Sequence, residues 1–237
     1  MKHFKRIFDS LNLVNILYGI CFCLAILALL KQYERYHDAR MYVQAIAQAV
    51  EPEVKRVALT FDDGPHPVYT EQLLDGLEAR GIKVTFFVTG ENAALHPDII
   101  KRMYDEGHLI GNHTYSHIQL TSSNREKFRD ELIKTSELIQ SITGDEVQYV
   151  RPPYGSWDKT FESELNMFPV LWNVDPLDWC SSNANRIARS VINEVSENNI
   201  ILMHDYYDSS VKAALMIVDE LTKRGYEFVT VDKILFD

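Results

Sequence analysis

The 237-residue sequence contains little cysteine and no tract that favours disorder. Three cysteines occur, and because Cys21 and Cys23 lie inside an apolar segment, we expect Cys180 to form no intrachain disulfide. The chain also lacks a cysteine cluster, so a bound metal would need histidine and carboxylate ligands. Repeats and low-complexity tracts are missing too, and a composition of 46% hydrophobic and 24% charged residues indicates a globular protein.

Basic residues are in deficit, with 24 lysines and arginines against 34 acidic residues and a formal net charge of −10. The first 40 residues hold six basic and three acidic side chains, so the negative balance lies in the rest of the chain. An acidic domain disfavours nucleic acid and other polyanions as partners. It is neutral toward uncharged sugar chains, and we expect no nucleic-acid partner and a monomer.

One long apolar run, Leu11 to Leu30, follows a cluster of Lys2, Lys5 and Arg6. About 20 helical residues span about 30 Å, the thickness of a bilayer core. We therefore expect residues 1–10 to be a cytoplasmic basic segment and residues 11–30 a single-pass transmembrane anchor, with the remainder outside the cell. A signal peptide that is cleaved to release a secreted protein is the main alternative, although Lys31 follows directly and no small-residue cleavage site lies close by. A buried helix of a soluble protein is a third interpretation.

Residues 31–54 predict a helical stalk that ends at Pro52, and residues 55–237 a catalytic domain. In this domain short β-branched runs alternate with longer amphipathic segments, which predicts about seven strand–helix units and a parallel sheet. The expected strands are Val57–Phe61, Val84–Val88, Leu109–Gly111, Val147–Arg151, Val170–Val174, Ile200–Met203 and Phe228–Val231. The expected helices are Thr70–Arg80, Pro97–Glu106, Arg125–Ile142, Lys159–Asn166, Ala184–Ser196 and Val211–Arg224. Such a chain forms an open doubly wound sheet or a barrel that lacks one of the usual eight units.

Polar residues follow five of these strands, and the carboxyl ends of parallel strands share one face. Asp62 and Asp63 follow the first strand, where an ordinary Asp-Gly-Pro turn is the alternative interpretation. His113 and His117 are spaced i and i+4, which on a helical turn brings two imidazoles to one ion. With Asp63 as a third ligand, two histidines and a carboxylate leave positions open for water and substrate, as catalytic metal sites do.

The other three clusters are ambiguous when each is taken alone. The segment Arg151 to Gly155 contains two prolines and predicts a rigid loop, which could direct the backbone N–H of Tyr154 at an oxyanion. The alternative interpretation is a loop with a purely structural role and a solvated arginine. The segment Asp175 to Trp179 offers two carboxylates and an aromatic ring for a sugar, or a cap and a core tryptophan. His204 comes at the end of the buried strand that contains Leu202. It is either a general acid or a histidine with a structural role.

Five sequence motifs, TFDDGP, HTYSH, RPPYG, DPLDW and LMH, occur in this order along the chain. With them the sequence resembles the polysaccharide deacetylases of the NodB homology domain, carbohydrate esterase family four, from Arg56 to about Ile234. The resemblance implies an α/β fold, a distorted (β/α) barrel of about seven units. Within the family, the chain resembles the peptidoglycan N-acetylglucosamine deacetylases.

The resemblance also implies a role for each site residue. Asp63, His113 and His117 would bind one divalent ion, zinc or alternatively cobalt or another metal. Asp62, held by Arg151, would be the general base that acts on metal-bound water, and His204 the general acid for the leaving amine. The backbone N–H of Tyr154 would donate to the oxyanion, and Asp178 would support His204, with Asp175 as a second candidate for that role. Trp179 would contact the sugar, and Leu202 would line the pocket for the acetyl group.

The expected activity is removal of N-acetyl groups from a polysaccharide, first of all from N-acetylglucosamine in peptidoglycan. Chitooligosaccharides, an exopolysaccharide, acetylxylan and N-acetylmuramic acid remain alternative substrates. A carbohydrate-binding relative without catalysis is a further alternative, but it would need neither Asp62 nor His204. The motifs do not discriminate among the substrates.

Overall fold

A computed structural model describes residues 2–49 and 54–236, and the chain forms two compact units, Met1–Glu53 and Val54–Asp237. The described part of the first unit is a helix, α1 (Lys2–Ala49), which continues through the expected boundary between anchor and stalk. The predicted end of the stalk at Pro52 lies outside the described residues. No helix among the described residues is long and apolar enough to cross a membrane, and the expected anchor is therefore not confirmed.

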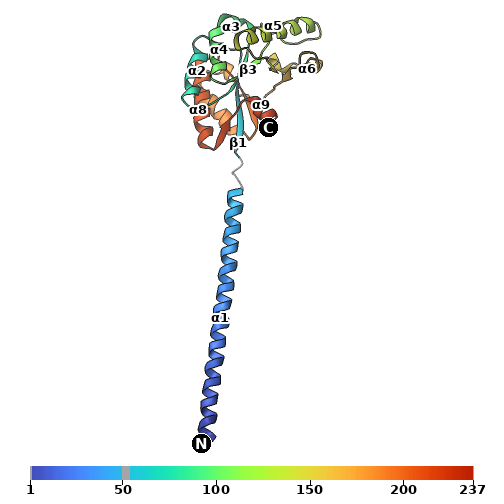
Figure 1. Cartoon of the computed structure of the whole chain (residues 1–237). Helices are drawn as coiled ribbons and strands as arrows, with labels where there is room; N and C mark the ends of the chain where they lie inside the picture. The colour runs from blue at the N-terminus through green and yellow to red at the C-terminus, as the bar shows by residue number, and fades with distance from the viewer. Residues whose placement is uncertain (1, 50–53, 237) are drawn as a thin grey trace. The chain divides into compact units, whose positions relative to one another are not determined.

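The second unit is built on one sheet of seven strands whose pairings are all parallel (Figure 1). The strand order is β5-β4-β3-β2-β1-β6, and β7 pairs with the first residues of β1. The strands are β1 (Lys55–Asp62), β2 (Thr85–Val88), β3 (Leu109–Asn112), β4 (Tyr149–Val150), β5 (Phe168–Pro169), β6 (Asn199–His204) and β7 (Tyr226–Phe228). The predicted parallel sheet is thus confirmed.

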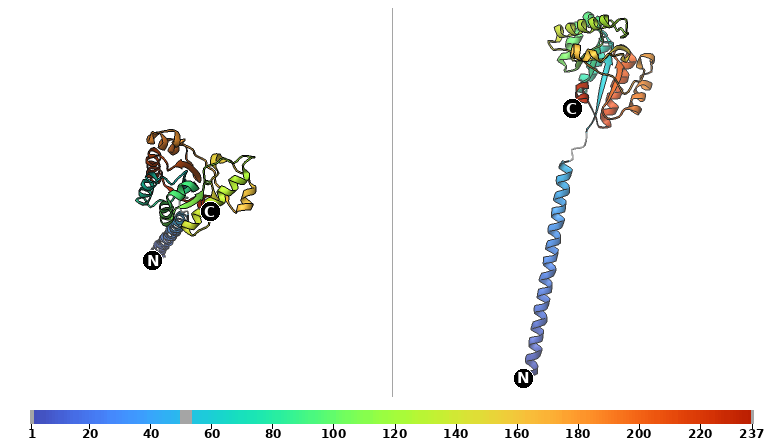
Figure 2. Two further views of the ribbon diagram at one scale, coloured as in Figure 1. Left: turned by 90° about the horizontal axis from the view of Figure 1, so that it is seen from above. Right: turned by 90° about the vertical axis from the view of Figure 1, so that its right-hand side faces the viewer.

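The helices cover the strands as a continuous outer layer, in which α7, α8, α2, α4 and α5 contact one another in that order (Figure 2). Their bounds are α2 (Tyr69–Glu78), α3 (Gly90–Leu95), α4 (Pro97–Asp105), α5 (Arg125–Thr143), α6 (Thr160–Leu165), α7 (Ala184–Glu194), α8 (Asp208–Lys223) and α9 (Val231–Leu235). Short 3₁₀ turns occur at η1 (Pro153–Gly155) and η2 (Asp178–Cys180). A parallel sheet curved inside such a layer is a (β/α) half-barrel.

The predicted strand Val170–Val174 is wrong, and hydrogen bonds give the reason. The N–H of Val170 donates to Val150 of β4 at 2.8 Å, whereas Val174 forms an isolated parallel bridge to Ile201 of β6. The segment therefore passes from one edge of the sheet to the other and forms no ladder with either. It closes the gap between the edge strands without adding a strand.

Alternation of side chains along the strands separates an outer core from an inner face. In β1 the odd positions Val57, Leu59 and Phe61 pack into the large core beneath the helices, and Ile201 and Met203 of β6 do the same. The even positions then face the inside of the half-barrel, ending at Asp62 in β1 and His204 in β6, which are register partners. Because side chains alternate with a period of two, Asp62 and His204 both point to the inner face at the same end of the sheet.

Candidate active site

Asp62 is fixed by the guanidinium of Arg151, which follows β4. Nη1 of Arg151 lies 2.7 Å from Oδ1 of Asp62 and also donates to Oγ1 of Thr60 at 2.6 Å. Both charged side chains are buried, and Nε of Arg151 donates to the carbonyl of Val170 at 3.1 Å. A buried ion pair with this many hydrogen bonds holds its carboxylate in one orientation.

Two aromatic rings complete the surroundings of Arg151. The guanidinium carbon lies 4.3 Å from the ring centre of Phe87 and 5.7 Å from that of Trp172. Contacts of this kind stabilise a cation that has lost its water. The side chain of Arg151 is therefore built into the site and is no solvated loop residue.

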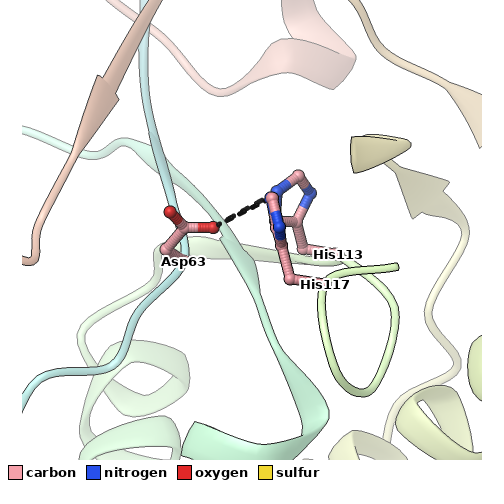
Figure 3. A group of neighbouring side chains, drawn as sticks. All are labelled: Asp63, His113 and His117. Atoms are coloured by element: carbon pink, nitrogen blue, oxygen red, sulfur yellow. Dashed lines mark ion pairs between the residues drawn. The ribbon is translucent and has the colours of Figure 1, made fainter. Parts of the chain in front are cut away.

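Asp63 follows the end of β1 and faces the two histidines of the loop after β3. Its Oδ1 lies 3.4 Å from Nε2 of His113 and 3.4 Å from Nε2 of His117, and Figure 3 shows the carboxylate directed at both rings. The three potential ligand atoms all lie within 4.8 Å of one another. One ion placed between them could bind all three.

The charge states of these groups suit a cation. Nδ1 of His113 lies 2.6 Å from the carbonyl oxygen of Arg151, which can only accept, so Nδ1 carries the proton and Nε2 presents its lone pair. Burial and the neighbouring His113 lower the pKa of His117, which favours its neutral form. Burial alone would raise the pKa of Asp63, but the nearby imidazoles hold it below its ordinary value.

The donor set therefore fits a divalent metal. Two imidazole nitrogens and one carboxylate oxygen suit zinc, cobalt and similar ions and leave coordination positions open. Within the described residues, nothing donates a hydrogen bond to the buried Oδ1 of Asp63. A buried carboxylate oxygen without a donor is costly, and a cation at this point would remove the cost.

The expectation that His113 and His117 share a helical turn is wrong. β3 ends at Asn112, and the histidines lie on a loop in which Thr114 and His117 have left-handed backbone with φ of 64° and 54°. Oδ1 of Asn112 accepts the N–H of Thr114 at 2.8 Å, which stabilises this loop locally. The two rings still approach to 4.9 Å between centroids, so loop geometry replaces helical spacing.

His204 is bonded to Asp178 through both its ring and its backbone. Nδ1 lies 2.7 Å from Oδ1 of Asp178, and the backbone N–H donates to Oδ2 at 2.9 Å. Burial alone would lower the pKa of His204, but Asp178, with Asp62 and Asp63, raises it to about 9. A protonated imidazole with Nε2 directed away from Asp178 can donate a proton.

Asp175 lies in the same wall but has a different partner. Its Oδ1 accepts the backbone N–H of Leu177 at 2.9 Å and so stabilises the turn before η2. Of the two carboxylates, Asp178 makes the hydrogen bond to His204 in the part of the chain described here. Asp175 is thus placed to shape the loop.

The three candidate metal ligands line one cavity of about 360 Å³ together with Asp62 and His204, whereas Arg151 and Asp178 are not among its lining residues. Trp179 and Tyr154 are its most exposed aromatic residues, whereas Leu202 is buried in its wall. Tyr154 has left-handed backbone with φ of 59° and follows the two prolines directly. The lining residues are Asp62, Asp63, His113, His117, Pro152, Tyr154, Trp172, Asp175, Trp179, Leu202, His204 and Tyr207.

Three residues of this site did not emerge from the sequence. Thr60 binds Arg151, Trp172 lines the cavity beside it, and Tyr207 lines the cavity from the segment before α8. Alternation gives a usable signal for Thr60, since it shares the inner face with Asp62. It gives none for Trp172, because the segment Val170–Val174 changes partner from β4 to β6 and forms no strand. No comparable pattern distinguishes Tyr207.

Comparison with known proteins identifies the family. The model of the polysaccharide deacetylase family matches residues 49–170, and the chain belongs to this family. The chain is 39% identical over 187 residues to a peptidoglycan-N-acetylmuramic acid deacetylase, PdaC, of Bacillus subtilis, which covers 79% of this chain and 40% of that protein. It is 40% identical over 181 residues to a peptidoglycan-N-acetylglucosamine deacetylase of Bacillus cereus, covering 73% of this chain and 66% of the relative.

Solved structures agree with the fold. The structure of the peptidoglycan deacetylase PdaC from Bacillus subtilis superposes with a TM-score of 0.74 at 39% identity, covering 78% of this chain and 92% of that one. This superposition shows that the half-barrel is the fold of the polysaccharide deacetylases.

The chain spans 40% and 66% of the length of the two curated relatives, which is less than two thirds in each case.

Proposed function

We propose that this protein is a metal-dependent hydrolase that removes N-acetyl groups from peptidoglycan, first of all from N-acetylglucosamine residues. The convergence of the donors Asp63, His113 and His117 with Asp62 and His204 in one cavity carries the proposal. Relatives described as peptidoglycan deacetylases support the substrate class. Zinc or cobalt fits the donor set, and a bound divalent ion lowers the pKa of water and polarises a carbonyl.

Asp62 is the general base of the proposed reaction. Its Oδ1 is committed to Arg151, while Oδ2 lies 3.8 Å from Nε2 of His113 and faces the metal position. Because Arg151 holds Oδ1, Oδ2 is the oxygen of Asp62 that is placed to accept a proton from the attacking water.

His204 is the general acid. Its Nε2 lies 4.0 Å from Oδ2 of Asp63, so the ring borders the metal position, and Asp178 keeps Nδ1 protonated at the same time. Cleavage of an amide requires a proton on the leaving nitrogen, because an amide anion is a very poor leaving group. The raised pKa of His204 supplies that proton at neutral pH. The backbone N–H of Tyr154 is the proposed donor to the developing oxyanion.

Acetate release tests this function. Purified enzyme with zinc is expected to release acetate from peptidoglycan faster than from chitooligosaccharides or acetylxylan. Chelation should stop the reaction and added zinc should restore it. The Asp62→Asn variant is expected to lose about 10²- to 10⁴-fold in kcat. Undiminished activity in Asp62→Asn would refute the base, and no release from any of these substrates would favour a carbohydrate-binding protein.

N-acetylmuramic acid is the second candidate substrate, because the PdaC relative is described as acting on it. The two candidates predict different products. After muramidase digestion of treated peptidoglycan, mass spectrometry should find free amines on glucosamine for the first substrate and on muramic acid for the second. If the substrate were a chitooligosaccharide or an exopolysaccharide, the enzyme would leave peptidoglycan unchanged.

The cellular location is proposed from the sequence alone. The basic cluster before the apolar run at 11–30 supports a single-pass anchor with the catalytic domain outside. Full-length protein is then expected in the membrane fraction and sensitive to protease added to intact cells. A shortened protein found in the medium would instead identify a cleaved signal peptide.

A further inference from the structure

Two adjacent tyrosines connect the cavity to the surface next to it. Tyr206 and Tyr207 lie between β6 and α8, directly after His204 and Asp205. The two residues are 39% and 42% exposed, and their rings contact each other edge to face at 6.2 Å between centroids. Tyr207 lines the cavity, whereas Tyr206 is not among its lining residues, so the pair extends outward from the wall.

The ring of Tyr206 is supported from beneath by a second aromatic pair. It meets His66 edge-on at 4.9 Å, and His66 stacks on Tyr69 at 4.5 Å. Nδ1 of His66 accepts the backbone N–H groups of Val68 and Tyr69 at 3.1 and 3.2 Å, which fixes the imidazole. Burial, helped by His96, lowers the pKa of His66, so the ring under Tyr206 stays uncharged.

The backbone that carries the tyrosines is anchored by Asp205. This carboxylate is fully buried and accepts a hydrogen bond from Oγ1 of Thr70, which itself accepts the backbone N–H of His66 at 2.7 Å. The carboxylate also packs against Gly64, where a side-chain carbon would collide with it. A surface held this firmly loses little conformational entropy when it binds a ligand.

The chemistry of the pair suits a neutral sugar ring. Each tyrosine offers an apolar face and one hydroxyl, and a pyranose has an apolar C–H face with hydroxyls at its edge. In the cavity beside them Asp62 is paired with Arg151, and Asp178 with His204, so these carboxylates are compensated and the cavity suits a neutral ligand. The distance between the two ring centres is of the size of one sugar ring.

We propose that Tyr206 and Tyr207 form a binding shelf for the sugar residue next to the one that loses its acetyl group. The proposal rests on the proposed function, because a neighbouring residue exists only if the substrate is a glycan chain. The shelf binds the chain through contact area and takes no part in proton transfer. Its loss should therefore raise KM and leave kcat nearly unchanged.

Kinetics with a pentasaccharide of N-acetylglucosamine test the shelf. Tyr206→Ala is expected to raise KM about five- to thirtyfold with kcat within about twofold. Tyr206→Phe, which keeps the ring and its contact with His66 but loses the hydroxyl, should raise KM less than Tyr206→Ala does. Phe236→Ala, which removes another exposed aromatic ring that is not among the cavity-lining residues, is the matched control and should change neither constant. An unchanged KM in Tyr206→Ala, or a loss confined to kcat, would overturn the shelf.

Binding separates the shelf from the proposed reaction. In a zinc-loaded Asp62→Asn background, calorimetry should show the affinity for the pentasaccharide falling by a similar factor for Tyr206→Ala and for Tyr207→Ala. If wild-type enzyme releases no acetate, the proposed function fails, and calorimetry with the wild type still decides the shelf. No binding of the pentasaccharide, or an affinity in both alanine variants as high as that of the protein with both tyrosines, would refute it. The second variant keeps the test valid if the first does not fold.

Discussion

His204 and Asp178 form a two-point contact, in which ring Nδ1 and backbone N–H bind the two oxygens of one carboxylate at 2.7 and 2.9 Å. The contact fixes the imidazole, its tautomer and its charge together. A histidine held in this way keeps Nε2 protonated and directed into the cavity. The first prediction concerns the pH at which this arrangement fails.

The activity is expected to fall as pH rises through about 9, where His204 loses its proton. Asp178→Asn removes the largest interaction that favours the charged imidazole, so its high-pH limb should move down by about one to two pH units. Asp175→Asn is the matched variant, and its limb should remain in place because Asp175 bonds Leu177. The measurement is the pH dependence of kcat at saturating zinc. If the limb moved only in Asp175→Asn, Asp175 and not Asp178 would be the residue that supports His204.

Removal of a metal ligand should abolish metal binding without unfolding the domain. His117→Ala is expected to lower zinc affinity by at least about 100-fold, since two ligands bind zinc far less well than three. His96→Gln, a histidine outside the donor set, is the control and should keep wild-type affinity. Calorimetry and the visible spectrum of the cobalt-loaded protein report the result independently of activity. Tight binding in His117→Ala would place the ion elsewhere.

The Arg151–Asp62 pair should show strong coupling in unfolding. Arg151→Met leaves a buried, unpaired carboxylate and is expected to cost about 3–5 kcal/mol. Asp62→Asn added to Arg151→Met removes that charge and should recover part of the loss. Urea unfolding of the two single variants, the double variant and the wild type gives the coupling energy. Additive losses would show that the two side chains do not stabilise each other.

Stability should fall in mild acid because of His108, a buried residue far from the cavity lining. Burial lowers its pKa to about 4, and Nδ1 accepts the N–H of Val84 at 3.1 Å. Because the folded pKa lies below the unfolded value, the unfolded state binds the proton more readily. The contribution of neutral His108 is complete above about pH 6.5 and is lost as pH falls toward 4.

His108→Asn, whose side-chain oxygen can still accept the N–H of Val84, tests this. The wild type is expected to lose about 1–3 kcal/mol more than the variant between pH 7 and pH 4.5. Urea unfolding of the zinc-loaded proteins at both pH values measures the difference. Parallel losses in the two proteins would assign the acid sensitivity to other groups.

Much of the fold could be predicted because its elements follow simple periodic patterns. Six of the seven expected strands overlap a strand of the structure, because each contains a short apolar run, although Phe228–Val231 meets β7 only at Phe228 and ends where α9 begins. Glycines after helices also behave as expected, and Gly81, Gly107, Gly144 and Gly225 all have positive φ. The segment Val170–Val174 could not be predicted correctly, because its change of partner from β4 to β6 depends on tertiary structure.

The site was predictable as a set of residues but not as a geometry. Strand ends predict that Asp62, Asp63 and His204 converge, since parallel strands share one carboxyl edge. The loop of His113 and His117 differs from the helical turn that their spacing suggests, because left-handed residues set its course. Tyr207 carries no local signal, since its position depends on contacts with segments far away in the sequence.

The contact between Gly64 and the buried carboxylate of Asp205 has a consequence for sequence divergence. Any side chain at position 64 needs space that only a smaller residue at position 205 can provide. A smaller residue at 205 would in turn leave the hydroxyl of Thr70 without its acceptor. Among descendants of this sequence, positions 64, 70 and 205 should therefore change together or remain as they are, although up to 141 residues separate them.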